Sequence, residues 1–364
     1  MFPALLPFFI SSELLMGYGV IQFMGVILEP IMRPLFNLPG VSSFVMAVGY
    51  TSGFPISASL AARLRKEKLC TRLEAERLMC FTNNASPLFM LVAVGAGMFY
   101  NARLGVLIAL CHYAANLLLG LLLRFYGRDD PKCVTRIVER GHLFQKALRE
   151  MKKAHRANAR PFGRMLGDAI TSSVNKLLVI GGFVIVFSII IKLSVLTGIM
   201  SIITKAMSLV TMPLGFTGSA VNSIGYGFFE ITLGAKAAAE AAAPLIQRLI
   251  AAGIILGWSG VSVLAQVSAM ISETDLKMGL FIFCRLLHAV FAGLFSYLLL
   301  QNHWVTAWLA KPAGTNMTVQ TLSLPWFTSL FYFARLCAYS ILAWTLVAVI
   351  VYIVRSLSVI RFRV

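Results

Sequence analysis

The chain has 364 residues, of which 59% are hydrophobic and only 13% are charged, and its mean hydropathy is +0.82. Soluble domains are about 45–50% apolar and about 25% charged, so this composition excludes a soluble protein and predicts a polytopic α-helical membrane protein. The net charge of +18 does not indicate nucleic-acid binding, because no aromatic–basic platform accompanies it. Of the 32 Lys and Arg residues, six lie in residues 63–77 and twelve in residues 124–164. The positive-inside rule predicts that both segments face the cytoplasm.

The sequence carries no motif for a common cofactor. Its six cysteines form no C-x-x-C pair, so it predicts neither a zinc site nor a disulfide framework. It has no G-x-x-x-x-G-K-[ST] motif, so we expect no ATP hydrolysis by the chain itself. Residues 1–30 lack the basic start and the cleavage site of a signal peptide, and we interpret them as a retained helix. We therefore expect no cofactor, no metal site and no enzymatic activity.

Apolar runs of the length that crosses a bilayer alternate with breaks rich in Gly, Pro and small polar residues. A spanning helix needs about 20 apolar residues, and the runs at 104–123, 177–193 and 280–300 meet this length. In chain order, the sequence first predicts a helix over 5–28, a Pro-rich connection, a helix from 41 interrupted at 53–55, a basic stretch at 63–77, a polar break at 82–87, an apolar segment to 100 and a span at 103–124. A cytoplasmic segment over 125–168 and spans at 174–198 and 200–222 follow. The last part contains a broken helix at 224–243, an apolar segment at 245–271, a span at 278–300, a loop over 301–325 and a last span at 328–354.

Two halves of the chain match each other when the sequence is shifted by 176 residues, the offset from His112 to His288. With this shift Gly49-Tyr50 falls on Gly225-Tyr226, and no gap is needed over about eighty residues. The connection after the first broken helix has six basic residues, whereas its counterpart has only Arg248. The positive-inside rule therefore predicts opposite orientations, and inverted repeats with broken helices are typical of secondary transporters.

The repeats define the predicted organisation of the chain. It consists of an N-terminal helix and connection at 1–40, the first repeat at 41–124, a basic cytoplasmic segment at 125–172, linking transmembrane helices at 173–220, the second repeat at 221–300, and an outward loop with a C-terminal helix at 301–364.

The polar breaks are the candidate substrate site. A broken helix is tolerated in a membrane only where it lines a cavity or is enclosed by protein. Thr82, Asn83 and Asn84 are typical N-cap residues, and Pro87 fits a first helical turn, so the sequence predicts that a half-helix begins there. In the second repeat Ser259 is the expected cap. Two such N-termini would bind an anion at mid-membrane; alternatively, these side chains only satisfy backbone groups freed by a kink.

Four ionisable or polar groups in apolar stretches are further candidates. Glu230 can bind a coupling ion or the substrate, form a salt bridge with Lys236, or lie at the membrane interface, because an intramembrane carboxylate usually has a function. Glu13 is a weaker candidate for the same roles. Arg285 can neutralise a carboxylate, bind the C-terminal end of a half-helix or contact the substrate, and Gln266 can reach the cavity.

The matched histidines allow two further interpretations. His112 and His288 can form helix-packing hydrogen bonds or take part in function. The stretch "GWSG" with Ser259 resembles a motif of intramembrane serine proteases, with His288 as the base. However, the first repeat has Asn83 at the serine position and keeps its histidine, so the repeat alone accounts for both residues. A non-transporting membrane scaffold is the other alternative.

Several stretches together resemble a known family. They are "LLPFFISSELLMGYG", "SGFPISASLAARLR", "EAERLMCFTNNASPLF", "FFEITLGAK", and "GVSVLAQVSAMIS" followed by "RLLHA". In order and spacing, from about residue 5 to residue 300, they resemble sporulation integral membrane proteins of endospore-forming bacteria. That family belongs to a wider group with nucleoside-recognition, or Gate, domains, which includes concentrative nucleoside transporters. Members of the family usually carry another apolar segment before "LLPFF".

The resemblance implies a substrate and a location. It implies that dipicolinic acid, a small aromatic dianion, is moved from the mother cell across the outer forespore membrane during sporulation. It also makes a homo-oligomer plausible, and it leaves open whether H⁺, Na⁺ or Ca²⁺ drives transport. The predicted substrate-binding residues are Gly53, Pro55, Thr82, Asn83, Asn84, Ser86, Glu230, Thr232, Ser259, Gly260, Ser262 and Gln266, and the predicted coupling or structural polar residues are Glu13, His112, Arg285 and His288.

Overall fold

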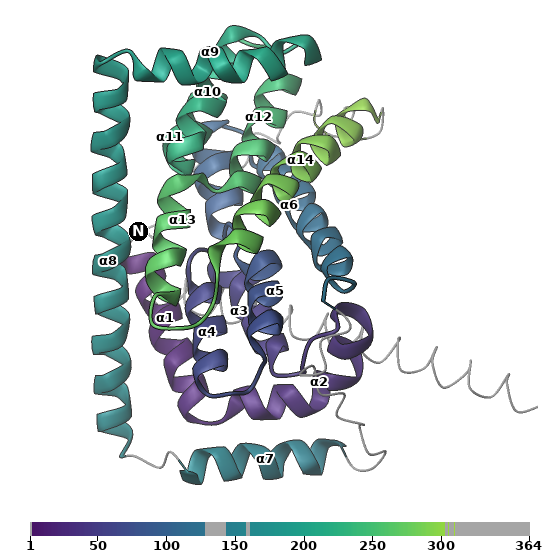
Figure 1. Cartoon of the computed structure of the whole chain (residues 1–364), viewed down its shortest axis with the longest axis vertical. Coiled ribbons are helices and arrows are strands. Elements are labelled where there is room, and N and C mark those ends of the chain that lie inside the picture. The colour runs from purple at the N-terminus through teal and green to yellow at the C-terminus, as the bar shows by residue number, and fades with distance from the viewer. Residues whose placement is uncertain (1, 128–142, 158–160, 303–304, 306–308, 310–364) are drawn as a thin grey trace, which may run out of the picture.

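The computed structural model describes residues 2–127, 143–157 and 161–302, together with residues 305 and 309. Every regular element in these ranges is a helix (Figure 1). Four helical segments are long and apolar enough to cross a membrane: α6 (Ala102–Leu123), α8 (Phe162–Leu196), the broken segment Leu245–Ile271, and α14 (Met278–Gln301). The predicted all-α membrane fold is therefore confirmed. The predicted loop at 301–325 and last span at 328–354 lie almost wholly outside the described residues.

The N-terminal segment is a bent pair of helices and not the single helix that the sequence predicted over 5–28. α1 (Phe2–Gly17) and α2 (Val20–Phe36) meet at an angle of 84°. The bend is at Gly19, which has φ 79° and lies so close to α7 (Leu143–Ala157) that a Cβ atom would be 2.7 Å from the Met151 carbonyl oxygen. The prediction of a Pro-rich connection was also wrong, because α2 continues through Pro30 and Pro34.

Two sets of five helices repeat along the chain with the same breaks. The first set is α3 (Ser42–Ser52), α4 (Ile56–Lys66), α5 (Arg72–Thr82), the π-helix η1 (Phe89–Met98) and α6. The second set is α10 (Gly218–Phe229), α11 (Ile231–Glu240), α12 (Leu245–Trp258), α13 (Gly260–Ile271) and α14. The starts of α3 and α10, the ends of α5 and α12, and the starts of α6 and α14 are each separated by 176 residues, the separation of His112 and His288. The repeat found in the sequence is therefore a repeat of structure.

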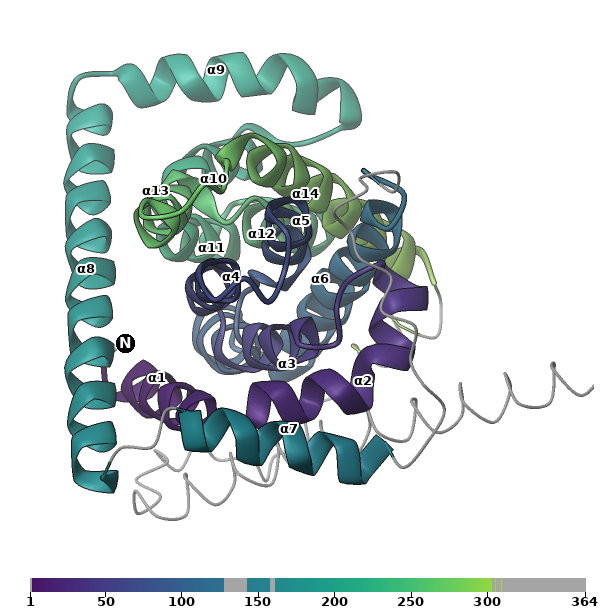
Figure 2. The same cartoon turned by 60° about the horizontal axis from the view of Figure 1, so that its bottom comes forward.

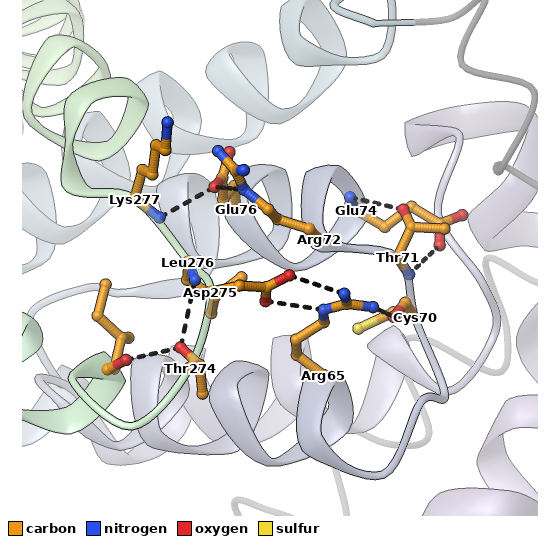
Figure 3. Close-up of polar contacts among 11 residues, drawn as sticks. Arg65, Cys70, Thr71, Arg72, Glu74, Glu76, Thr274, Asp275, Leu276 and Lys277 are labelled. Atoms are coloured by element: carbon orange, nitrogen blue, oxygen red, sulfur yellow. Dashed lines mark hydrogen bonds and ion pairs between the residues drawn. The ribbon is translucent and has the colours of Figure 1, made fainter.

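The two sets have opposite orientations. The α4–α5 connection contacts the α13–α14 connection through Arg65, whose guanidinium donates to both carboxylate oxygens of Asp275 at 2.9 and 2.7 Å (Figure 3). At the other end of the molecule, the α11–α12 region contacts the η1–α6 connection, with the Arg248 guanidinium 5.4 Å from the centre of the Phe99 ring. We call these the basic end and the opposite end. A parallel repeat would bring the α4–α5 and α11–α12 connections to the same end, so the repeats are inverted.

In each repeat the first two helices form a hairpin that enters and leaves at one end. Glu74, in the first turn of α5, accepts from Arg33, in the last turn of α2, at 2.7 Å, so the α2–α3 connection lies at the basic end with the α4–α5 connection. In the second repeat, Ser219 at the start of α10 donates to the Ala242 carbonyl beyond the end of α11, at 3.0 Å. The turns at 53–55 and near 230 are thus hairpin tips inside the molecule.

The segment between the repeats forms a frame around them. α8 runs along one side of the molecule, and α7 and α9 (Ile199–Thr211) lie across its two ends (Figures 1 and 2). The predicted span at 200–222 was wrong. α9 has 13 residues, or about 20 Å of helix at 1.5 Å per residue, which is too short for the roughly 30 Å hydrocarbon core. A short turn containing Pro213 follows it, and the second repeat already begins with Gly218.

Candidate functional site

Each hairpin tip is packed against the break in the broken helix that follows it. In the first repeat, a Cβ atom on Gly53 would lie 2.9 Å from the Ser86 backbone nitrogen. In the second repeat, a Cβ atom on Gly260 would lie 3.0 Å from the Phe229 carbonyl oxygen. Both glycines have a positive φ, of 86° and 84°. The structure therefore brings the predicted breaks together in pairs, one pair in each repeat.

Four half-helices begin at these paired breaks. α4 and α13 run from the breaks to the basic end and pack against each other, whereas η1 and α11 run to the opposite end and also pack against each other. All four N-termini consequently lie between the two ends of the molecule. Because the N-terminus of a helix carries roughly half a positive charge and free N–H groups, this arrangement favours an anion over a cation.

The caps of these half-helices differ from those that the sequence predicted. Thr82 is the last residue of α5 and donates to the Leu78 carbonyl at 2.8 Å, and Asn83 is the C-cap of α5. The helical turn that leads into η1 begins at Pro87, and the Ser86 hydroxyl accepts from the Phe89 N–H at 3.2 Å. The prediction of Thr82, Asn83 and Asn84 as N-caps was wrong because Thr82 and Asn83 end the preceding helix and Asn84 directly follows its C-cap.

Ser259 does not cap α13 either. It has φ 70°, and its hydroxyl donates to the adjacent Trp258 carbonyl. α4 likewise has no side-chain cap, because its N-cap residue is Pro55. By contrast, Glu230 caps α11, with its Oε2 accepting from the Leu233 N–H at 2.7 Å. Two of the four N-termini, those of α4 and α13, therefore have no side-chain acceptor.

The α5–η1 break is held by polar side chains from α4 and α6. The Ser57 hydroxyl on α4 donates to Asn83 Oδ1 at 3.0 Å, and the Asn116 amide on α6 donates to Asn84 Oδ1. The Tyr113 hydroxyl, which has a single proton to donate, lies within hydrogen-bonding distance of the carbonyls of Tyr50, at 2.9 Å, and of Ala85, at 3.2 Å. Sequence reasoning missed Ser57, Tyr113 and Asn116. The signal for the last two was present, since both are polar residues within one turn of His112 in an apolar span.

Arg285 is completely buried at the same break. Its Nη1 donates to the Asn83 carbonyl at 2.9 Å, and its Nη2 donates to the Cys80 carbonyl and to Asn116 Oδ1, the latter at 3.4 Å. The carbonyls of Cys80 and Asn83 belong to the C-terminal end of α5. Of the three roles that the sequence left open for Arg285, these contacts are those of binding the end of a half-helix.

The two repeat-related histidines meet where α6 packs against α14. Their ring centres are 4.4 Å apart, and both rings are buried. His288 Nε2 donates to the His112 carbonyl at 2.9 Å, and His112 Nε2 accepts from the Ala85 N–H at 3.4 Å. Both histidines therefore make helix-packing hydrogen bonds. Ser259 and His288 each bond to a backbone carbonyl, which is not the arrangement of a serine nucleophile with its base.

The second pair of breaks has fewer hydrogen bonds than the first. Trp258 Nε1 donates to the Phe228 carbonyl at 2.9 Å, and the two rings stack. Gln266 donates to the Ser262 hydroxyl at 3.3 Å, and Thr232 lies half-buried in the first turn of α11. The possible salt bridge of Glu230 with Lys236 is not formed. Lys236 is 61% exposed and faces Glu240 at 4.0 Å, whereas Glu230 is 4% exposed.

Glu13 is not part of either break. It lies on α1, where its carboxylate accepts from Arg63 on α4 at 2.8 Å and from Lys176 on α8 at 2.7 Å. Glu13 therefore links α1 to α4 and to α8 through ion pairs. The structure therefore separates Glu13 from the other candidates.

The basic end carries a second cluster of charges, shown in Figure 3. Besides Arg65 and Asp275, Glu76 accepts from the Lys277 N–H at 2.9 Å and from Arg72 at 2.8 Å. The hydrogen bond from Arg65 lowers the pKa of Asp275 below its usual value. These contacts tie the two repeats together at one end.

The described residues thus define an all-helical polytopic membrane protein built from two inverted repeats with paired breaks. The pattern of the Gate family, described as nucleoside recognition, matches residues 1–102. The sporulation integral membrane protein YlbJ of Bacillus subtilis (strain 168) is 46% identical over 312 residues, which cover 84% of this chain and 75% of that protein. This chain belongs to the same family of sporulation integral membrane proteins.

Two solved structures also align with the chain. One is CNTnw in an inward-facing, substrate-bound state, with 14% identity over 80% of this chain and 74% of that chain. The other is a doubly substituted form of CNTnw in an outward-facing state, with 15% identity over 81% of this chain and 76% of that chain. The TM-score is 0.37 in both comparisons.

Proposed function

We propose that this protein is a membrane transporter for a small organic anion, which binds between the two pairs of breaks. The observation that carries this proposal is the position of four half-helix N-termini between the two ends of the molecule, two of them without a side-chain cap. Broken helices at the interface of inverted repeats are the usual place for substrate in secondary transporters. Access to the two sides of the membrane would alternate as one bundle of helices moves against the other.

We further propose that the anion is dipicolinate and that the membrane is the outer forespore membrane. Membership of a sporulation protein family supports a role in sporulation. Dipicolinate carries two carboxylates on a flat ring, and the two uncapped N-termini of α4 and α13 lie on helices that pack together. The positive charge of these N-termini favours a dianion over a neutral molecule of the same size.

Uptake of radiolabelled dipicolinate into proteoliposomes tests the proposal. We expect saturable uptake by the purified full chain, measured with and without imposed H⁺, Na⁺ or Ca²⁺ gradients. Asn83→Ala and Ser259→Ala should both reduce uptake, because each lies at one of the paired breaks. A lack of uptake by folded protein under every gradient would contradict the proposal. A loss confined to Ser259→Ala would favour a catalytic serine.

A non-transporting scaffold is the second candidate. The burial and hydrogen bonding of Thr82, Asn83 and Asn84 favour it, because these are the properties of residues that only stabilise a kink. A scaffold predicts normal insertion and stability with no flux of any anion. The proteoliposome assay therefore separates the two functions.

A further inference from the structure

A buried positive charge, that of Arg285, lies at the α5–η1 break. Arg285 is 0% exposed, and its three acceptors are two backbone carbonyls and one amide oxygen. Among the described residues, no carboxylate pairs with it. A buried cation is costly unless an anion or a full set of hydrogen bonds compensates it, and Arg285 Nε–H also has no partner among the described residues.

Asn83 adds a second unpartnered donor at the same place. Its side chain is 0% exposed, and while its Oδ1 accepts from Ser57, its Nδ2 has no partner among the described residues. Arg285 bonds to the carbonyl of this same residue. Ser57 is the second residue of α4, so Asn83 also lies at the uncapped N-terminus of α4. A guanidinium, an amide donor and a helix N-terminus thus adjoin one another.

The neighbouring histidines do not supply the acceptor. Because His112 Nε2 accepts a hydrogen bond, a neutral His112 carries its proton on Nδ1 and is a donor there. Because His288 Nε2 donates, a neutral His288 has a lone pair on Nδ1. Neither Nδ1 atom has a hydrogen-bond partner among the described residues, so the two rings together leave one donor and one acceptor. The excess of donors therefore remains with Arg285 and Asn83.

We infer that the α5–η1 break is an anion-binding site, in which Arg285 is the fixed positive charge and Asn83 Nδ2 a donor to the bound carboxylate or halide. The inference deepens the proposed function, on which it rests for the identity of the anion. It gives Arg285, on the second repeat, a role in selecting an anionic substrate bound at the first. The anion has two possible sources, a substrate carboxylate or an inorganic anion such as chloride.

The decisive variant is Asn83→Asp. The variant keeps the hydrogen bond that Asn83 makes through its side chain, because Oδ1 can still accept from Ser57. It also replaces the unpartnered Nδ2 donor with an acceptor beside Arg285. The new carboxylate would take the place of the bound anion. We expect the variant to fold with an unchanged or higher melting temperature, and to lose at least about tenfold in anion affinity, as expected for a charge-assisted hydrogen bond.

The measurement is the melting temperature of the full chain in lipid nanodiscs, titrated with sodium dipicolinate, sodium chloride or sodium gluconate at equal ionic strength. Asn101→Asp is the matched control, because Asn101 caps α6 near the opposite end and accepts there from the Arg103 N–H. A dipicolinate-dependent rise that Asn83→Asp abolishes and Asn101→Asp preserves supports the site with a substrate carboxylate. The same pattern with chloride supports it with an inorganic anion.

Two results would overturn the inference. One is a rise that persists in Asn83→Asp, and the other is a wild-type melting temperature that neither dipicolinate nor chloride changes relative to gluconate. Failure of the proposed function is distinguishable, because it would appear as an absence of uptake in proteoliposomes while the anion-dependent shift and its loss in Asn83→Asp remain. Uptake without a shift sensitive to Asn83→Asp would leave transport standing and remove this site.

Discussion

Gly53 is the residue at which the chain reverses at the tip of the first hairpin. Its φ of 86° and ψ of −169° lie in a region that only glycine adopts without large strain. Its small size matters as much as its backbone, since a Cβ atom would come within 3.0 Å of two atoms of Ser86. The close contact of the hairpin tip with the α5–η1 break therefore depends on this one residue.

Replacing Gly53 with alanine should weaken both stability and transport. We expect Gly53→Ala to lose about 1–3 kcal/mol of stability from backbone strain alone, and to lower dipicolinate uptake because the tip must move away from Ser86. Thermal unfolding in detergent and the proteoliposome assay measure the two effects. Gly279→Ala is the control, because nothing lies within 4 Å of a Cβ atom at that position in α14. Equal behaviour of the two variants would contradict the prediction.

Residue types predicted the places of the breaks but not the roles of the side chains in them. Glycine and proline act locally, so Gly53, Pro55 and Gly260 mark breaks that the structure contains. The hydrogen bonds of Asn83 and Asn84 depend on α4, α6 and α14, which are distant in sequence. The sequence therefore predicted correctly that Asn83 and Asn84 are polar residues of a break, but it assigned them to the start of the following helix and not to the end of α5.

At the scale of the elements, the ion pairs of the basic end connect the α4–α5 and α13–α14 connections. The side chains of Arg65 and Asp275 are 31% and 48% exposed, so solvent screens their attraction. The lowered pKa of Asp275 means that its stabilising contribution is present above its ordinary pKa of 3.8 and is lost as the pH falls below that value. At neutral pH the pair is fully formed.

Removing this charge should have a small, salt-dependent effect. We expect Asp275→Asn to lose about 0.2–1 kcal/mol of stability at low salt, and the difference from wild type should shrink at 1 M NaCl, where the Debye length is about 3 Å. Melting temperatures at the two salt concentrations check this. Glu240→Gln is the control. It removes an exposed charge whose partner, Lys236, lies on the same helix, so its loss of stability should not depend on salt in this way. A salt-independent loss in Asp275→Asn would contradict the electrostatic explanation.

Hydropathy could predict most of the elements, but it could not distinguish a spanning helix from one that lies across the end of a frame. The stretch at 200–222 contains the short apolar helix α9, which ends at Thr211. Pro213 and the glycines at 215 and 218 were the available signals for this end. By contrast, the second repeat could be found from the sequence because it matches the first repeat, and the paired breaks recur at equivalent positions.

At the scale of the whole molecule, the inverted repeat places equivalent connections on opposite sides of the membrane. Lys68 lies exposed in the α4–α5 connection, and Glu240 lies exposed at the end of α11. We expect a cysteine introduced at position 68 to react with a membrane-impermeant maleimide only from the cytoplasm, and one introduced at position 240 only from the other side.

The native cysteines should contribute little to the labelling signal. Cys70, Cys80, Cys111 and Cys284 are buried, so Cys133→Ser and Cys337→Ser complete a chain with little reactivity of its own. Labelling of both positions from the same side would contradict the inverted topology. Labelling of each from the side opposite to that expected would preserve the inversion and reverse the orientation derived from the positive-inside rule.

The bond from Arg285 to the Asn83 carbonyl joins residues 202 positions apart, and this separation has a consequence for how the protein is made. At roughly 5–20 residues per second of synthesis, the end of α5 emerges about 10–40 s before the arginine that binds it. Residues 1–102, the part that matches the Gate pattern, therefore cannot complete their own break. During that interval the carbonyls of Cys80 and Asn83 must be accommodated by water or by the insertion machinery, and the first repeat reaches its final form only when the last helix of the second has entered the membrane.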